Sequence, residues 1–204
     1  MDKNRFATKG NLLAAKRSLS LAKTGFELMD KKRNILIREM MLLVDNANKI
    51  QSQIDGIFGT AYKSLQLANI THGVIQNIAA SVPIDSGLDI RVKSIMGVEV
   101  PIVRLSERDI GVPYGLNESS STLDNAYINF LKVKDLCATL AELENSVYRL
   151  AIAIKKTQKR ANALKNIIIP KLEETIKYIT GVIEEKEREE FSRLKIIKKT
   201  KNNA

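Results

Sequence analysis

The residue types that most often carry out chemistry are few in this sequence and widely separated. The chain has one histidine, His72, and one cysteine, Cys137, so no ordinary zinc site can be assembled from these residue types. A lone histidine is far more often a surface or packing residue, and we expect Cys137 to be a small buried side chain. The 10 glycines show no phosphate-loop or dinucleotide-binding spacing. We therefore predict that the protein is not itself an enzyme and binds no metal or cofactor.

Charge is the second chemical feature of the sequence. The chain contains 33 lysines and arginines against 23 acidic residues, and its net charge of +10 allows a nucleic-acid, acidic-protein or anionic-membrane partner. The basic residues gather near both ends: Lys3, Arg5, Lys9, Lys16 and Arg17, and then Arg193, Lys195, Lys198, Lys199 and Lys201. Phe6 is the one aromatic residue interleaved with them, which is too few for base stacking, so we expect no nucleic-acid partner. Solubility alone explains such ends, and so does insertion of a basic tip into an acidic or polar protein cavity.

The remaining composition favours long helices in a protein outside the membrane. Aromatic residues make up only 5% of the chain, and there are 4 prolines among 204 residues. No apolar run reaches the ~18 residues needed to span a bilayer, so we expect no direct membrane insertion. A single cysteine excludes an intramolecular disulfide and suits a reducing compartment.

The first long element is predicted from an apolar stripe with alternating steps of three and four residues. The stripe runs Leu12, Ala15, Leu19, Ala22, Phe26, Met29, Arg33, Leu36, Met40, Leu43, Ala47, Ile50, Ile54, Ile57, Ala61, Ser64, Ala68, with two polar members. This 3.5-residue repeat predicts a left-handed coiled-coil seam. Thr8 or Asn11 can cap the start of the helix, and Pro83 predicts an end near Ala79.

A second stripe predicts another long helix near the end of the chain. Its members are Leu136, Leu140, Leu143, Val147, Leu150, Ile154, Thr157, Ala161, Leu164 and Ile168. Consecutive steps of four then lead to Leu172 and Ile176, a stutter that locally unwinds a supercoil. The stutter falls at Pro170, which lacks an N–H and crowds the preceding turn. We predict that the helix bends at Pro170 and continues. Ser121 to Asp124 resembles a capping box and predicts where the helix starts.

These two helices predict the fold class. Each would have about 65 to 75 residues and a length of ~100 Å, and neither would be stable without the apolar stripe of the other. The predicted fold is mainly α: a long antiparallel two-helix coiled coil, or helical hairpin, with a short β-hairpin in the central segment. Residues 1–80 form the N-terminal coiled-coil helix, residues 81–120 the central segment, and residues 121–204 the C-terminal coiled-coil helix. The two chain ends are then expected to lie together.

The central segment alternates apolar and polar residues, as a β-hairpin does. One face is predicted to hold Ile90, Val92, Val98, Val100 and Ile102, and the other Arg91, Lys93 and Glu99. Ile95, Met96 and Gly97 can form the turn, and Pro101 places its strand at an edge. Because a lone hairpin is marginal in water, we expect it to pack on the coiled coil or on a partner.

The polar member Arg33 of the first stripe suggests a specific contact. If residue 12 pairs near residue 190, then residue 33 lies near residue 169 and therefore opposite Pro170. We hypothesise that Arg33 donates a hydrogen bond to the carbonyl of Asn166, which Pro170 leaves without its donor. The alternative is that a water molecule serves this carbonyl, or that Arg33 extends its charged end into solvent.

Three blocks of the sequence resemble a known family. They are FELMDKKRNILIRE near the start, IMGVEVP in the predicted hairpin, and RANALKNIIIPKLEETIKYI near the end. In this order and over nearly the whole chain, they resemble the D subunit of the V-type and A-type rotary ATPases. The last block is the most specific, because it joins R-x-N-A-L to I-P-x-L-E-x-T-I at a fixed spacing.

The resemblance implies a central-stalk rotor subunit that transmits torque between a catalytic ATP-binding hexamer and a membrane ion-translocating ring. The paired chain ends would enter the hexamer of catalytic and regulatory subunits. The hairpin end would stand toward the subunit that connects to the ring, and a small stalk protein, the F subunit, would bind the side. The protein would then be cytoplasmic and peripheral to the membrane within a membrane-bound complex.

Combining this role with the positions of the basic residues gives a set of expected hexamer contacts. They are Arg5, Lys9, Lys31, Lys32, Arg33, Lys165, Lys171 and Arg193. The bend at Pro170 would make the shaft eccentric, so that the hexamer meets unequal faces. The alternative function is a coiled-coil scaffold or a nucleic-acid-associated protein.

Overall fold

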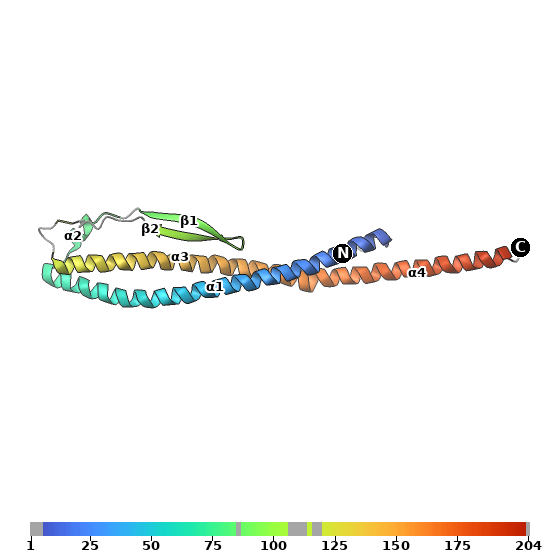
Figure 1. The fold of residues 1–204 in the computed structure, drawn as a ribbon, viewed down its shortest axis with the longest axis horizontal. Helices are drawn as coiled ribbons and strands as arrows, with labels where there is room; N and C mark the ends of the chain where they lie inside the picture. Colours follow the sequence, from blue (N-terminus) through green and yellow to red (C-terminus); the bar gives the residue numbers. More distant parts are fainter. Residues whose placement is uncertain (1–5, 85–86, 106–113, 116–119, 203–204) are drawn as a thin grey trace. The chain divides into compact units, whose positions relative to one another are not determined.

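The fold is that of a computed structural model, which describes residues 6–84, 87–105, 114–115 and 120–202. The elements in chain order are α1 (Lys9–His72), α2 (Gln76–Ser81), β1 (Leu88–Ile95), β2 (Val98–Leu105), α3 (Ser121–Ala163), the π-helical segment η2 (Leu164–Ile168) and α4 (Ile169–Asn202). Figure 1 shows the long helices and the hairpin. The predicted fold class, mainly α with long paired helices and a β-hairpin between them in sequence, is confirmed.

The chain divides into two compact units. Unit 1 consists of Met1–Asn34 together with Lys155–Ala204, and unit 2 consists of Ile35–Ile154. Helices α1 and α3 each contribute residues to both units.

In unit 1, the start of α1 runs antiparallel to the end of α3, η2 and α4. Two ion pairs mark this direction: Lys9 Nζ lies 2.8 Å from Glu187 Oε1, and Lys23 Nζ lies 2.8 Å from Glu173 Oε1. The buried residues of the seam are Ala15, Ala22, Thr157, Ala161 and Ile179. Most of these side chains are small, which allows two helices to approach closely at the seam.

In unit 2, the rest of α1 packs against α3 and the hairpin. One core cluster is formed by Leu36, Val100 and Leu150, and the second by Ala68, Tyr114 and Leu123. Leu36 and Leu150 are fully buried, as the predicted stripes require. The polar member Ser64 of the first stripe has a partner, because the Nδ2 of Asn129 donates a hydrogen bond to its Oγ at 3.1 Å.

The helix ends follow the predicted caps only in part. Thr8 caps α1, since its Oγ1 accepts the N–H of Asn11 at 3.2 Å. The expected end of α1 near Ala79 is wrong: the helix ends at His72, because Gly73 adopts the left-handed conformation with φ 77°. Six of the following residues form the separate helix α2.

The start of α3 lies where the capping-box pattern placed it, but the capping contacts differ. The backbone carbonyl of Ser120 accepts hydrogen bonds from the N–H groups of Leu123 and Asp124. The carboxylate of Asp124 accepts a 2.6 Å hydrogen bond from the hydroxyl of Tyr114. Burial and this hydrogen bond raise the pKa of the Tyr114 hydroxyl well above its usual value. The side chain of Tyr114 is therefore tied to the first turn of α3.

The hairpin has the predicted turn but not the predicted faces. Strands β1 and β2 pair antiparallel with Ile95 opposite Val98, so Met96 and Gly97 form a two-residue turn in which both have positive φ. This is the geometry of a type I′ turn. Opposite residues share a face, and the register puts Ile90 opposite Val103 and Val92 opposite Pro101. The prediction that Ile90 and Val92 share a face with Val98, Val100 and Ile102 is therefore wrong.

The faces differ in burial as well as in composition. Val100, on the face that also carries Arg91 and Lys93, is buried against Leu36 and Leu150. Ile90 and Val92 lie on the opposite face and are 59% and 62% exposed. The hairpin therefore packs on the helices of unit 2 through β2, while β1 stays exposed along almost its whole length.

Candidate interaction surfaces

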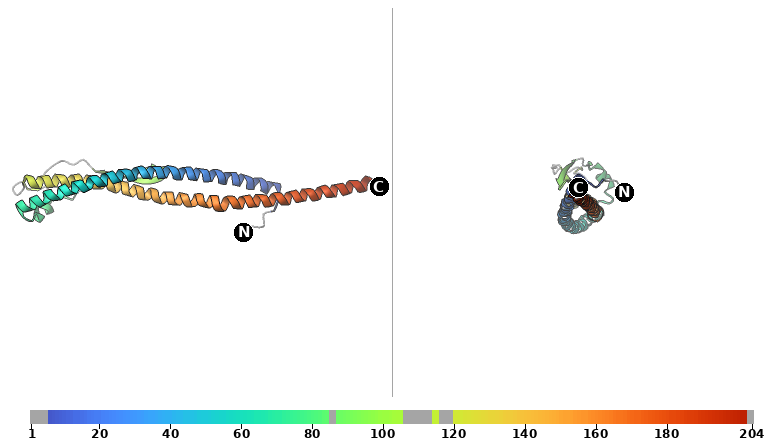
Figure 2. Two further views of the ribbon diagram at one scale, coloured as in Figure 1. Left: turned by 90° about the horizontal axis from the view of Figure 1, so that it is seen from below. Right: turned by 90° about the vertical axis from the view of Figure 1, so that its right-hand side faces the viewer.

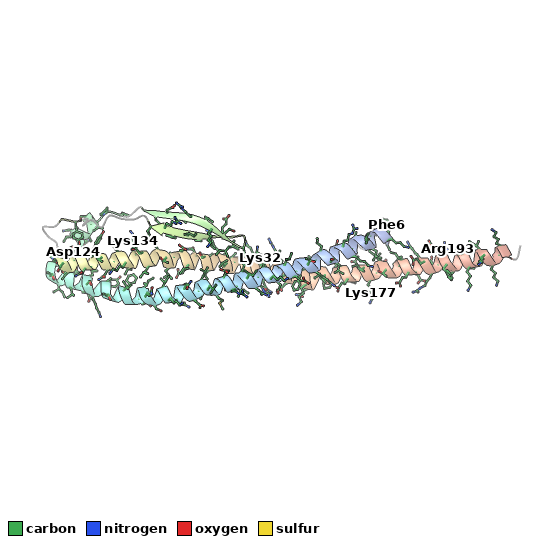
Figure 3. All side chains as sticks on the ribbon, in the orientation of Figure 1. Phe6, Lys32, Asp124, Lys134, Lys177 and Arg193 are labelled. Carbon is green, nitrogen blue, oxygen red and sulfur yellow. The ribbon has the colours of Figure 1, made fainter. Side chains whose placement is uncertain are left out.

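The positive charge of the protein belongs to one of the two units. Unit 1 contains 23 lysines and arginines against 10 acidic residues, a net charge of +13. Unit 2 contains 10 against 13, a net charge of −3. Long-range attraction to an acidic partner surface would therefore act on unit 1. Figure 3 shows Lys32, Lys177 and Arg193 of this unit among the side chains along its helices.

The expected contact residues of unit 1 fall into two groups. Lys31, Lys32 and Lys171 have no ion-pair partner among the described residues, so their charges are available to another molecule. Lys9 is bound to Glu187, and this hydrogen bond raises the pKa of Lys9. Arg193 lies 3.9 Å from Glu189 on the same exposed helix face, a weak contact.

The other expected contact residues make contacts within unit 1 or fall outside the described residues. Lys165 places its Nζ 5.8 Å from the centre of the Phe26 ring, a cation–π contact within unit 1. Arg33 is held by three neighbouring side chains. Arg5 lies outside the described residues.

The hypothesis that Arg33 bonds to the carbonyl of Asn166 is wrong. Its Nη1 donates to Oε1 of Gln158 at 2.8 Å, and its Nη2 lies 2.7 Å from the carboxylate of Asp30. The Nε and Nη2 groups also donate to Oδ1 of Asn34. The assumed register caused the error, because the pairing of Lys9 with Glu187 brings Arg33 opposite a residue of α3 that precedes η2. Gln158 directly follows the stripe residue Thr157. This polar residue beside the second stripe was the one feature of the sequence that could have indicated a partner for Arg33.

The helix irregularity predicted at Pro170 is a π-helical turn just before the proline. The helix continues without interruption from α3 through η2 into α4, as predicted. The N–H of Ile169 bonds to the carbonyl of Leu164, five residues back, in place of the α-helical partner at Lys165. Pro170 has no N–H to donate. The carbonyls of Lys165 and Asn166 therefore lack the donors that a regular helix would supply.

The π-helical segment also explains the irregular spacing of the second stripe. Leu164 and Leu172 are eight residues apart, one more than the seven of a regular heptad. A π turn takes up one additional residue in a helix. The stripe then resumes on the same side, since Ile179 is buried and Leu172, Ile176 and Ile183 are half-buried. The irregularity is a one-residue insertion, and Ile167, at 64% exposure, is displaced into solvent.

Among the described residues of unit 1, none pairs with the end of α4 as a companion helix. Because Lys9 pairs with Glu187, the described part of α1 begins beside the middle of α4, and the predicted pairing of residue 12 with residue 190 is wrong. Residues 184–201 are all exposed. These residues include Phe191, Leu194 and Ile197, at 70%, 65% and 61% exposure. Figure 2 shows α4 continuing past the start of α1 in unit 1.

Metal-ligating side chains are not clustered in the part of the chain that the structure describes. No cluster of three or more histidine, cysteine, aspartate or glutamate side chains there could hold a metal ion. Cys137, predicted to be buried, is exposed on α3. No described helix combines the length and the apolar character needed to cross a membrane.

Two long helices that pair antiparallel along buried apolar seams define a coiled-coil protein of the mainly α class. Residues 11–199 match the family of the ATP synthase D subunit, and the chain belongs to this family. It is 44% identical over 193 residues to the D subunit of V-type ATP synthase from Thermotoga neapolitana, covering 94% of this chain and 95% of the relative. It is 37% identical over 196 residues to the D subunit of A-type ATP synthase from Pyrococcus furiosus, covering 94% and 92%. A 37% identity over 195 residues links it to the A-type D subunit of Methanopyrus kandleri, covering 94% and 84%.

Proposed function

We propose that this chain is the central-stalk rotor subunit of a V/A-type rotary ATPase. It transmits torque between a catalytic ATP-binding hexamer and a membrane ion-translocating ring, and it takes no part in the hydrolysis itself. The observation that carries the proposal is the family match over residues 11–199, which includes both long helices and the hairpin. The subunit works in the cytoplasm, peripheral to the membrane.

The seams of the helices support a role in torque transmission. A shaft must resist sliding of one helix past the other, and an apolar seam alone fixes the register weakly. Polar pairs at seam positions fix it more strongly, because a slipped register leaves their groups without partners. The Arg33–Gln158 pair does this in unit 1, and the Ser64–Asn129 pair does it in unit 2.

The charge of unit 1 supports its placement inside the hexamer. A net charge of +13 favours a cavity lined by acidic or polar groups. Lys31, Lys32 and Lys171 are the best candidates for contacts that differ among the three similar catalytic interfaces, since their charges are unpaired among the described residues. The π turn at η2 adds asymmetry, because it exposes Ile167 beside carbonyls that lack their regular α-helical donors.

Unit 2 then serves the other partners of the stalk. We assign the small F subunit of the stalk to the side of the shaft and the ring-connecting subunit to the end that carries α2. The exposed apolar residues Ile70 and Val74 near the end of α1, at 82% and 85% exposure, suit a protein contact there.

Reconstitution of the complete rotary complex with variants of this subunit tests the proposal. The chain should co-purify with a nucleotide-binding hexamer, and the triple change of Lys31, Lys32 and Lys171 to alanine should weaken the coupling of ATP hydrolysis to ion transport. Replacing the exposed Lys49, Lys63 and Lys132 of unit 2 by alanine provides the control for loss of charge. Unchanged coupling in the triple lysine variant would refute the proposed contacts of these three lysines with the hexamer. Absence of the wild-type chain from the complex would refute the rotor role itself.

A further inference from the structure

The two outer edges of the hairpin differ in how their backbone groups are satisfied. The two-residue turn makes Ile95 and Val98 a hydrogen-bonded pair, so the outer edge of β2 carries the N–H and C=O groups of alternate residues from Glu99 onward. Two of these groups contact α3. The N–H of Val103 donates to Oε2 of Glu142 at 2.7 Å, and Arg149 donates to the carbonyl of Glu99 at 3.1 Å. The outer edge of β2 also contains Pro101, which has no N–H to satisfy.

Among the described residues, the outer edge of β1 has neither such contacts with α3 nor a proline. The same register directs the N–H and C=O groups of Leu88, Ile90, Val92 and Ser94 away from β2. Within the residues that the structure describes, the sheet has two strands, so no further strand covers this edge. The edge contains no proline, and its eight residues pair with β2 without a bulge. Proteins usually block such an edge, because it is a template for another chain.

The side chains of β1 add an exposed apolar surface to the open edge. Leu88, Ile90 and Val92 alternate along one face and are 52%, 59% and 62% exposed. Pro101 and Val103, opposite Val92 and Ile90, extend this face onto β2. An exposed apolar strand of this length is unfavourable in water unless a partner covers it.

The other face of β1 is charged and indicates what kind of segment would fit. Arg91 and Lys93 lie on it, together with Asp89 and, across the register, Arg104. Arg91 pairs with Asp89 at 2.9 Å, so the face retains a net positive charge. Lys93 lies opposite Val100 of β2 and has no ion-pair partner among the described residues. A strand added beside β1 would place its own side chains next to these cations on one face and next to Leu88, Ile90 and Val92 on the other.

We propose that β1 accepts an added strand from a partner polypeptide, and that this segment alternates aliphatic and acidic residues. Its backbone pairs with the outward groups of Ile90, Val92 and Ser94, its aliphatic side chains cover the exposed face, and its carboxylates approach Lys93. The partner belongs to the assembled complex, so this assignment rests on the rotor role proposed above.

The test uses the full chain in the complex reconstituted from all subunits. Val92→Pro removes an outward N–H and keeps the ladder to β2, as Pro101 does on the opposite strand. Lys93→Glu reverses the charge that faces the added strand, with Lys63→Glu on α1 as the matched control. We expect Val92→Pro and Lys93→Glu each to weaken binding of the partner polypeptide at least tenfold, and Lys63→Glu to leave it unchanged. Hydrogen exchange of the segment 88–95 should slow at least tenfold when the wild-type complex assembles.

Each outcome decides the proposal. Wild-type affinity in both β1 variants, or unchanged exchange in segment 88–95, overturns it and leaves the rotor role intact. Self-association of the isolated chain that is abolished by Val92→Pro also overturns it, because the occupant is then a second copy. If the wild-type chain does not enter a rotary complex, the rotor role fails. The edge is then tested on the isolated full chain with the blocked peptide (Val-Glu)4: slower exchange in segment 88–95 supports strand addition, and no change refutes it.

Discussion

Deleting Ile167 together with the change Pro170→Ala should leave unit 1 folded with its seam intact. The deletion shortens the interval from Leu164 to Leu172 from eight residues to seven, so the π turn can become a regular α-helical turn without rotating the rest of α4. Ile167 is 64% exposed, so its loss removes little packing. We expect the free energy of unfolding to change by less than about 1 kcal/mol.

Two matched variants show how large the loss of stability should be when the seam or the helix is disturbed. Deleting Ile167 alone leaves Pro170 inside a regular helix, which costs about 3 kcal/mol. Deleting Lys177, an exposed residue after the π turn, rotates the following residues by about 100° and removes Ile179 from the seam. Ile179 is only 1% exposed, and displacing it together with the half-buried Ile183 should cost about 4 kcal/mol.

Urea unfolding of the four proteins, followed by far-UV circular dichroism, measures these differences. We expect the wild type and the double variant to have the highest free energies of unfolding, and the two single deletions to have much lower ones. If the double variant is destabilised as strongly as the Lys177 deletion, the π turn does not absorb an extra residue of the seam and this account of the sequence is refuted.

Three further predictions concern single contacts. A double-mutant cycle with Arg33→Met and Gln158→Met should give a coupling energy of about 1 kcal/mol in urea unfolding, and simple additivity would show that the pair does not fix the register. Gly97→Ala should destabilise the hairpin by about 1 kcal/mol, because φ is 77° there, and faster hydrogen exchange in β1 and β2 would report it. The environment that raises the pKa of the Tyr114 hydroxyl stabilises the fold while this hydroxyl is protonated. In the unfolded chain the hydroxyl ionises above pH about 10, so this contribution to the free energy of unfolding is lost as the pH rises above that value. Stability should therefore fall more steeply above pH about 10 in the wild type than in Tyr114→Phe, and equal slopes would contradict the role of the hydrogen bond to Asp124.

Periodicity predicted the elements well because burial along a helix depends mainly on local spacing. The stripe residues Leu36, Leu150 and Ile179 are buried, and the hairpin turn at Met96 and Gly97 lies where predicted. Extending the stripe past His72 failed, because a single glycine in the left-handed conformation ends a helix whatever apolar residues follow.

Long-range register could not be predicted, since it depends on where two distant segments meet. The Arg33 hypothesis failed for this reason: the partner is Gln158, and the stripes alone allow several alignments. The hairpin faces failed for a related reason. The apolar residues of β1 and β2 were assumed to share a face, but the two-residue turn fixes a register in which Val92 and Val100 lie on opposite faces. The exposed outer edge of β1 could be recognised only once that register was known.

The unaccompanied stretch of α4 after Glu187 has a consequence for how the protein behaves before and after assembly. A single helix of about 15 residues in water holds its shape only marginally, and six basic side chains crowded along it repel one another. Enclosure by a partner would supply both the apolar surroundings for Phe191, Leu194 and Ile197 and the opposing charge. The end of α4 would then become rigid only when a partner encloses it, and it would fray in the free protein.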